Sequence, residues 1–315
     1  MIKVIEAFAG VGSQRMALRN IGVEHEVVGV FEIDKYALQS YKAIHGDCPN
    51  LGDISNVNLH DIPDHDLFTY SFPCQDISIC GKKAGINSET RSGLLYECKK
   101  IIKNKRPKYL LLENVKNLVG KKFIDDFNEW LKYLESLGYT NFYKVINAKN
   151  YGVPQNRERV FCVSILGNSD FKFPIVNKTY SLNSYLENDV DKKYFSIKQC
   201  VMNNIEREFD NICKYDGDIY SCKCTSGFQD NRVGIKLSPC LRANNNLSIV
   251  RVFNDGYNVR RITPLESWRL MGFKDEDFFK SKNSGISDTQ LYKQAGNSIV
   301  VPILESIFKE LFLNG

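Results

Sequence analysis

The N-terminal segment constrains the fold most, because a glycine turn separates two apolar runs. Residues 2–9 are apolar and β-prone, Gly10-Val-Gly12 follows them, and residues 15–20 have a helical pattern. A second apolar run, residues 26–33, comes next. Glycines at such a turn let a ligand approach the backbone, and the following helix N-terminus presents unpaired N–H groups. This order of strand, turn, helix and strand predicts an α/β sheet with a ligand site at its strand ends.

Acidic residues near these strand ends suggest what the ligand is. Glu32 follows the turn at about the 20-residue spacing at which an acid binds ribose hydroxyls. The dinucleotide fingerprint is incomplete, because Arg15 replaces its third glycine. Glu32 or Asp34 could instead cap the next helix. Asp53 sits where a third strand would end and could bind an adenine amino group, although an acid in a turn is more often structural. We expect a cofactor that contains a nucleoside.

A cysteine follows another predicted strand. The β-prone run 66–70 leads into Pro73 and Cys74, and Pro73 favours an extended chain before it. A thiol at a strand end is a candidate nucleophile, whereas an isolated cysteine is more often a small buried hydrophobe. Glu113 ends the apolar run 108–112, where a carboxyl group is costly unless it is used or paired. The polar, glycine-rich residues 81–91 are a candidate lid.

Composition limits the classes of protein. Residues 168–258 are rich in Asn, Asp, Lys and Ser, which predicts loops and short strands, and Thr263-Pro264 then opens a helix. Ten cysteines without a secretion signal favour a cytoplasmic protein with reduced thiols. No apolar run is long enough for a membrane helix, and Cys222-Lys-Cys224 lacks zinc-site spacing, so we expect neither a membrane span nor a metal. The net charge of +5 is compatible with a polyanionic partner.

Six ordered motifs resemble those of the DNA cytosine-C5 methyltransferase family. They are Phe8-Ala-Gly10-Val-Gly12, Pro73-Cys74-Gln75, Glu113-Asn114-Val115, Gln155-Asn-Arg157-Glu-Arg159, Arg261-Ile-Thr-Pro-Leu-Glu266 and Gln294-Ala-Gly-Asn297-Ser298. The resemblance implies a Rossmann-like S-adenosylmethionine-dependent methyltransferase domain with a smaller, mostly β and loop target-recognition domain. The expected boundaries are 1–196 plus 286–315 for the catalytic domain and 197–285 for the recognition domain.

The resemblance implies S-adenosylmethionine as cofactor and S-adenosylhomocysteine as product. Glu32 would hold the ribose hydroxyls and Asp53 the adenine. Ile33 stands where many relatives place an aromatic residue that stacks on adenine, so that stacking should be weaker here. The expected cofactor residues are Phe8, Ala9, Gly10, Gly12, Glu32, Ile33, Asp53, Leu94, Asn297 and Ser298.

The resemblance also implies a mechanism. Cys74 would attack carbon 6 of a flipped cytosine, Glu113 would hold ring nitrogen 3, and Arg159 would contact the base oxygen. Arg157 and Arg159 would project to the same side if their strand is extended. The expected catalytic residues are Cys74, Glu113, Arg159, Arg157, Asn114, Pro73 and Gln75.

The expected substrate is double-stranded DNA. Gly227-Phe-Gln229-Asp-Asn-Arg232 resembles the recognition loop of small bacterial members, and Cys240 replaces the threonine of a Thr-Leu pair that follows it. The expected DNA-recognition residues are Gln229, Arg232, Arg242, Ser78 and Lys82. We expect a bacterial or phage monomer, with an independently acting restriction endonuclease as a possible partner. A tRNA cytosine methyltransferase or an inactive DNA-binding regulator remains an alternative, although no Cys-Phe-Thr tripeptide occurs in the variable region.

Overall fold

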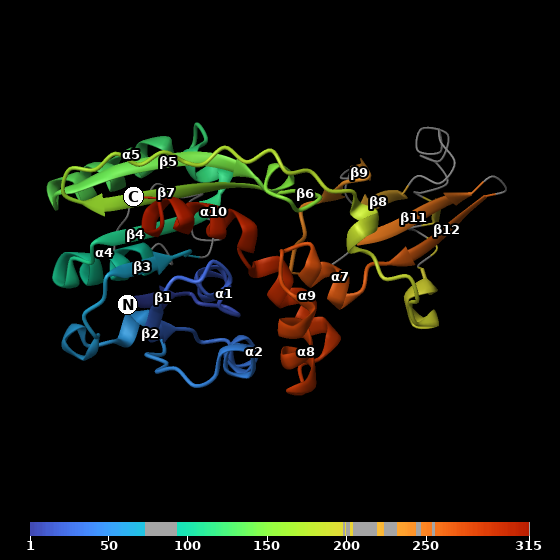
Figure 1. Cartoon of the computed structure of the whole chain (residues 1–315), viewed down its shortest axis with the longest axis horizontal. Coiled ribbons are helices and arrows are strands. Elements are labelled where there is room, and N and C mark those ends of the chain that lie inside the picture. The colour runs from blue at the N-terminus through green and yellow to red at the C-terminus, as the bar shows by residue number, and fades with distance from the viewer. Residues whose placement is uncertain are drawn as a thin grey trace. The chain divides into compact units, whose positions relative to one another are not determined.

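A computed structural model of the chain describes residues 1–72, 93–197, 199, 202–203, 219–223, 232–243, 247–253 and 256–314. The chain divides into two compact units, which are described separately. The first unit comprises Met1–Ile146, Glu158–Ile175 and Ile303–Gly315, and the second comprises Asn147–Arg157 and Val176–Pro302. Figure 1 shows the elements of both units. The expected boundaries between the catalytic and recognition domains, near residues 196 and 286, divide the chain by function. They stay a prediction.

A six-stranded sheet forms the centre of the first unit. Its order is β2-β1-β3-β4-β7-β5, and β1, β2, β3 and β4 pair in parallel while β7 is antiparallel to β4. The strands are β1 (Ile2–Ala7), β2 (His25–Phe31), β3 (Leu67–Tyr70), β4 (Tyr109–Val115), β5 (Tyr139–Asn147) and β7 (Glu158–Leu166). The predicted α/β sheet is therefore present. Its four parallel strands end at one edge.

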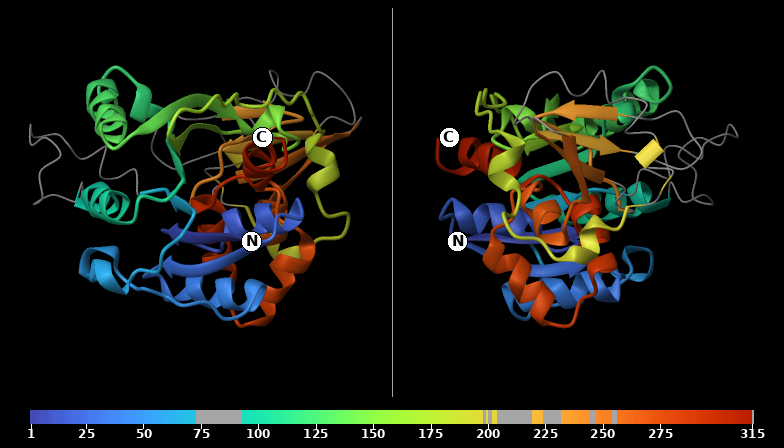
Figure 2. Two further views of the ribbon diagram at one scale, coloured as in Figure 1. Left: turned by 60° about the vertical axis from the view of Figure 1, so that its left-hand side comes forward. Right: turned by 90° about the vertical axis from the view of Figure 1, so that its right-hand side faces the viewer.

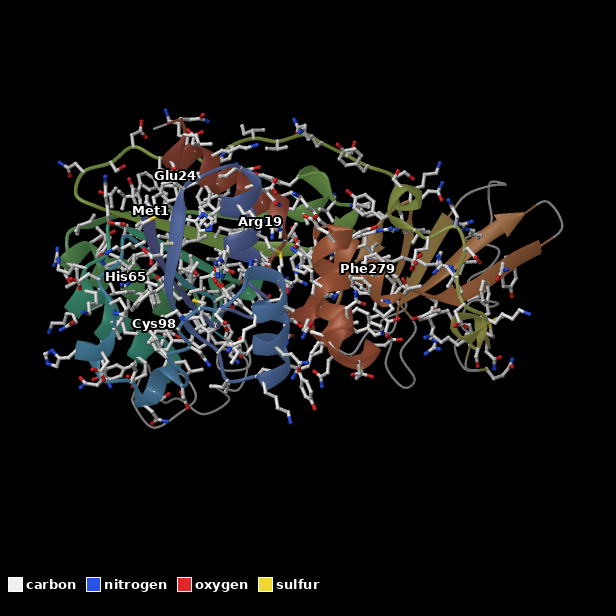
Figure 3. All side chains as sticks on the ribbon, turned by 60° about the horizontal axis from the view of Figure 1, so that its bottom comes forward. Met1, Arg19, Glu24, His65, Cys98 and Phe279 are labelled. Carbon is white, nitrogen blue, oxygen red and sulfur yellow. The ribbon has the colours of Figure 1, made fainter. Side chains whose placement is uncertain are left out.

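Helices cover both faces of this sheet (Figures 1 and 2). On one face, α4 (Gly93–Lys105) and α5 (Ile124–Ser136) pack their apolar residues against alternate residues of β3 and β4, such as Phe68 and Leu110. Cys98 of α4 belongs to this core, and both Cys98 and the buried His65 are labelled in Figure 3. Successive side chains of a strand point to opposite faces of the sheet, so the residues between these must be covered on the other face.

The other face carries α1 (Ser13–Asn20) and α10 (Val301–Phe312), while α2 (Lys35–His45) follows β2. Asn20 donates to Glu305 across 2.8 Å, which joins α1 to α10. Phe312 meets the ring of Tyr109 edge-on, with 5.1 Å between the ring centroids. The residues of β3 and β4 that point away from α4 and α5 are thereby covered as well.

The second unit contains a four-stranded antiparallel sheet, a short parallel pair and a cluster of helices. The sheet order is β12-β11-β8-β9, and β6 pairs with β10. The strands are β6 (Gln155–Asn156), β8 (Ile219–Lys223), β9 (Arg232–Ile235), β10 (Ser238–Pro239), β11 (Leu247–Phe253) and β12 (Gly256–Arg261). The β and loop character predicted for residues 168–258 agrees with these short strands.

The helices of the second unit are α7 (Pro264–Arg269), α8 (Asp275–Asn283) and α9 (Asp288–Asn297). The predicted cap is present, because the Thr263 side chain accepts the Glu266 N–H and Pro264 occupies the first helical position. Trp268 is fully buried, packs against Phe273 and Phe278, and donates its indole N–H to the Leu291 carbonyl. Among the described residues, no helix is long and apolar enough to cross a membrane.

One local expectation is wrong. No third strand ends at Asp53; the chain makes a single parallel bridge between Asn50 and Val30, and Asp53 caps a short 3-10 helix, Ile54–Asn56. Gly52 has a φ of 76°, which turns the backbone out of an extended path at this point.

Candidate active site

Strand β3 ends beside β4, the strand that carries the predicted catalytic residues Glu113 and Asn114. Tyr70, the last residue of β3, lies beside Leu112 in the parallel register, two residues before Asn114. The Asn114 side-chain amide donates to the Phe72 carbonyl across 3.0 Å and is buried. Asn114 therefore holds the chain at the last described residue before Pro73. Pro73, Cys74 and Gln75 lie outside the described residues.

Glu113 and Arg159 form an ion pair at the same edge of the sheet. Their strands are antiparallel neighbours, and Arg159 Nε lies 3.3 Å from Glu113 Oε1. Both side chains are largely buried, with exposed fractions of 9% for Glu113 and 18% for Arg159. Arg159 also donates from Nη1 to the Glu158 carbonyl. A guanidinium held in this way orients the carboxyl group and compensates its charge.

Arg157 has a different set of partners, although it lies only two residues from Arg159. Strand β6 ends at Asn156 and β7 begins at Glu158, so Arg157 interrupts the extended run. Its guanidinium donates to the carbonyls of Leu241, Gly296 and Ser298. The expectation that both arginines project to one side assumed a continuous strand, which is absent at Arg157.

The glycine turn after β1 is closed by Glu32, which follows the end of β2. Glu32 accepts the Gly10 N–H at one carboxyl oxygen and the N–H groups of Ile33 and Asp34 at the other. The turn uses positive φ angles, 57° at Gly10 and 81° at Gly12. No atom of the described residues lies within 4 Å of the place that a Cβ on Gly10 would take, so this part of the structure leaves the backbone open there. An open glycine beside a half-buried carboxylate fits the ribose and backbone contacts expected of a nucleoside cofactor.

The remaining cofactor candidates of the first unit are Phe8 and Ala9 at the turn, and Ile33, Asp53 and Leu94 further along the chain. Phe8 has a φ of 58° and packs, like Leu94 of α4, against the core below the sheet edge. Ala9 is buried and donates to the Phe31 carbonyl. Ile33 is 78% exposed, as a side chain available for a ligand would be. Asp53 is exposed and accepts the Ser55 N–H.

Two cofactor candidates belong to the second unit. Asn297 is the exposed last residue of α9, and Ser298 is the buried residue that caps the helix. The Ser298 hydroxyl donates to the Gln294 carbonyl across 2.6 Å.

Of the recognition candidates, Arg232 begins β9 and Arg242 is exposed in the segment after β10. Ser78, Lys82 and Gln229 lie outside the described residues.

Sequence reasoning missed Glu6, which lies beneath the glycine turn. Glu6 is fully buried in β1, where it accepts the Arg15 N–H across 2.9 Å and the Tyr41 hydroxyl across 2.7 Å. Burial raises the pKa of Glu6 to about 7, although the Tyr41 bond and the Arg15 charge act in the opposite direction. A charged residue inside the apolar run 2–9 was the available signal. Glu6 joins β1 to α1 and α2, and so fixes the turn between them.

It also missed two buried polar residues of the second unit. Gln155 accepts the Leu241 N–H and donates to the Leu270 carbonyl. Arg260 makes a bidentate ion pair with Glu266, at 2.8 and 2.6 Å, and both side chains are buried. The motif that seemed to begin at Arg261 therefore uses Arg260 for its pair, while Arg261 donates to the Lys193 carbonyl. The position of Gln155 within Gln155–Arg159 was the signal for the first residue, and the Arg-Arg sequence concealed the second.

Comparison with known proteins gives one consistent result. Residues 2–313 match the family model described as C-5 cytosine-specific DNA methylase. Type II methyltransferase M2.ScrFI of Lactococcus lactis subsp. cremoris is 41% identical, and the match covers 99% of each chain. Type II methyltransferase M.NlaX of Neisseria lactamica is 34% identical over 99% of this chain and 96% of its own.

Solved structures share the fold at lower identity. The S. pombe Dnmt2 methyltransferase superposes with a TM-score of 0.74 at 18% identity, covering 100% of this chain and 99% of the other. A putative DNA modification methyltransferase encoded within an E. coli prophage gives a TM-score of 0.70 at 18% identity and covers 100% of both chains. These likenesses agree with the predicted Rossmann-like methyltransferase fold.

Proposed function

The chain belongs to the C-5 cytosine-specific DNA methylase family, and from this premise we propose that it is a DNA (cytosine-5) methyltransferase of the type II restriction-modification kind. The observation that carries the proposal is the group at the ends of β3 and β4. Glu113 is paired there with Arg159, and Asn114 holds the carbonyl of Phe72, two residues before Cys74.

The proposed chemistry needs both a nucleophile and an acid. The Cys74 thiolate adds to carbon 6 of cytosine, which forms a sulfur–carbon bond and makes carbon 5 electron-rich. Glu113 holds or protonates ring nitrogen 3 while charge develops there. After carbon 5 has accepted a methyl group, it loses its proton to solvent, and the electron pair of the broken carbon–hydrogen bond re-forms the double bond between carbons 5 and 6 and expels Cys74 as a thiolate. S-Adenosylmethionine, when bound, supplies the methyl group that carbon 5 accepts. Arg159 keeps the Glu113 carboxyl group in place and contacts the base oxygen.

Glu32 and the open backbone at Gly10 support the proposal that the first unit holds the ribose part of S-adenosylmethionine. Asp53 would bind the adenine amino group, and the exposed Ile33 would lie against its ring. Asn297 and Ser298 are further cofactor candidates by the family pattern. S-Adenosylhomocysteine would leave as product.

The proposed substrate is double-stranded DNA, and the target cytosine must be flipped out of the helix at a cost of a few kcal/mol. Arg232 and Arg242 are proposed to contact the DNA, together with Gln229, Ser78 and Lys82. An Arg that donates two hydrogen bonds to guanine would discriminate between bases by about 1–3 kcal/mol. A cognate endonuclease, a monomeric state and a cytoplasmic location remain further predictions.

Bisulfite sequencing of DNA from cells that express the protein tests product and target together. We expect one short sequence to become protected at its cytosine. Protection of no DNA site, with incorporation of tritiated methyl groups into tRNA instead, would favour the tRNA alternative. No incorporation into either nucleic acid would favour the inactive regulator.

The Cys74→Ser variant tests the nucleophile. Tritium transfer from labelled cofactor to DNA should fall more than about ten-thousandfold, because nucleophile replacements in other enzymes cost this much or more. Cys80→Ser is the matched control, since it removes another thiol only six residues further along the sequence. Full transfer by Cys74→Ser would refute the mechanism.

A further inference from the structure

Residues 238–243 of the second unit are fixed at their beginning by backbone pairing. Ser238 and Pro239 form β10 beside Gln155 and Asn156 of β6, and the Ser238 N–H donates to the Pro154 carbonyl across 2.7 Å. The segment then continues to the exposed Arg242, a proposed DNA-recognition residue. Its conformation determines where that guanidinium lies.

The peptide groups on either side of Leu241 are held by two buried side chains of one motif. The Leu241 N–H donates to Gln155 Oε1 across 3.0 Å, and the Leu241 carbonyl accepts from Arg157 Nη1 across 3.1 Å. Gln155 is fully buried, and its amide nitrogen donates to the Leu270 carbonyl across 2.7 Å. The amide orientation is therefore determined by its partners, and the residue before Arg242 is held at its N–H and its carbonyl.

The other nitrogen of Arg157 reaches the end of α9. Nη2 donates to the Ser298 carbonyl across 2.8 Å and to the Gly296 carbonyl across 3.2 Å. Arg157 is 3% exposed. A planar guanidinium can bind two backbone segments in one fixed geometry, which a lysine ammonium cannot reproduce. Arg157 thus joins residues 240–241 to residues 296–298.

The backbones of these two segments also touch. A Cβ added to Gly296 would lie 2.3 Å from the Ala243 nitrogen and 2.3 Å from the Arg242 carbonyl carbon. Such contacts are far shorter than carbon allows, so residue 296 must be glycine for the two backbones to pack in this way. A shift of residues 296–298 would therefore be transmitted directly to Arg242 and Ala243.

We propose that Arg157 is a positioning residue that couples cofactor binding to DNA recognition. The inference rests on the proposed function, in which Asn297 and Ser298 contact the cofactor and Arg242 contacts DNA. Cofactor contacts that order residues 296–298 also order residues 240–243 through the Arg157 fork and the Gly296 contact. The cofactor therefore strengthens cognate DNA binding, and DNA strengthens cofactor binding by the same factor.

The test measures binding and does not depend on turnover. The affinity of the full chain for a duplex that carries the bisulfite-defined site is measured with and without S-adenosylhomocysteine. We expect S-adenosylhomocysteine to tighten DNA binding about tenfold or more in the wild type and less than about threefold in Arg157→Lys. Arg269→Lys, which weakens the Arg269–Asp275 pair in the same unit, is the control and should retain the coupling.

Equal coupling in Arg157→Lys and the wild type would overturn the proposal, as would no coupling in the wild type. If Arg157→Lys does not fold, hydrogen exchange of the wild type decides the matter. Saturating S-adenosylhomocysteine without DNA should slow amide exchange in the peptide that contains residues 238–243, and unchanged exchange there would overturn the proposal. If the wild type transfers methyl groups but Arg157→Lys shows the same coupling as the wild type, only this inference is refuted. If the wild type binds no S-adenosylhomocysteine, the proposed function is refuted as well.

Discussion

The two units use buried polar side chains in opposite ways. In the first unit, Glu113 lies at the end of a parallel strand, where Arg159 holds its carboxyl group at the sheet edge. In the second unit, Gln155, Arg157 and the Arg260–Glu266 pair lie inside and hold backbone segments together. The comparison teaches that burial of a charged residue does not by itself identify a catalytic group. The two cases are distinguished by the groups that the charged side chain contacts.

Glu113→Gln tests the role given to the first unit's residues and should have the largest effect of the variants that probe this comparison. The amide cannot supply a proton to ring nitrogen 3, so methyl transfer should fall about a thousandfold or more. The melting temperature should change little, because Gln keeps the volume and can still accept a hydrogen bond from Arg159. Single-turnover tritium transfer and thermal unfolding measure the two quantities. A rate near wild type would remove Glu113 from the catalytic group.

Arg260→Leu tests whether the buried Arg260–Glu266 ion pair stabilises the second unit. It leaves Glu266 buried without its ion-pair partner, which should lower the free energy of unfolding by about 3–4 kcal/mol in urea titration. The double variant Arg260→Leu/Glu266→Gln should recover part of this loss, because a neutral amide costs less to bury than an unpaired carboxylate and its one oxygen can still accept either the Thr263 or the Glu187 N–H. If Arg260→Leu has the free energy of unfolding of the wild type, the buried pair does not stabilise the second unit.

Glu6 of the first unit resembles the charged residues of the second, because it is fully buried and accepts a backbone N–H. Its pKa is raised by burial from the ordinary 4.5 to about 7, so the folded protein keeps a proton that the unfolded chain releases. The stability contributed by this proton is full below about pH 4.5 and is lost as pH rises through 7. Between pH 5 and 8 the loss should be about 2–3 kcal/mol.

The Glu6→Gln variant should remove this pH dependence, since Gln does not titrate. Urea titrations of wild type and variant at pH 5 and pH 8 provide the measurement, and Glu24→Gln at the exposed end of the turn before β2 is the control. The same slope with pH in the wild type and the Glu6→Gln variant would assign the dependence to another group.

Ile33→Phe should have the smallest effect and would sharpen the picture of the cofactor edge. The side chain is exposed, so the protein should tolerate the larger ring. If adenine lies against residue 33, an aromatic ring should tighten S-adenosylhomocysteine binding about threefold, as stacking contributes roughly 0.5–1.5 kcal/mol. Ile175→Phe, at a second highly exposed isoleucine, is the control. Isothermal calorimetry giving equal affinities for all three proteins would place adenine elsewhere.

Much of the first unit could be predicted from sequence, because alternating strands and helices leave a periodic signal. The glycine turn, the acid at Glu32 and the arrival of Glu113 at the sheet edge follow from that order. The family motifs added the roles of these residues. Asp53 was misplaced relative to a strand because the positive φ at Gly52 is a local backbone choice that the apolar pattern around it does not reveal.

The second unit was harder to predict because its contacts link residues far apart in sequence. Gln155 and Arg157 bind backbone groups more than 80 residues away, and such partners leave no periodicity. Alternation suggested that Arg157 and Arg159 share a face, but the break between β6 and β7 separates their roles. Thr263 and Pro264 were predictable because a helix cap is determined by its immediate neighbours.

The close packing at Gly296 bears on attempts to alter the target sequence by exchanging parts between relatives. A recognition segment grafted from another enzyme would bring its own backbone conformation at residues 242–243. In this protein that backbone packs directly against Gly296, which has no side chain that could move to relieve a clash. A chimera should therefore include residues 296–298 from the same donor as the graft. Two segments that lie far apart in the sequence would have to be exchanged together.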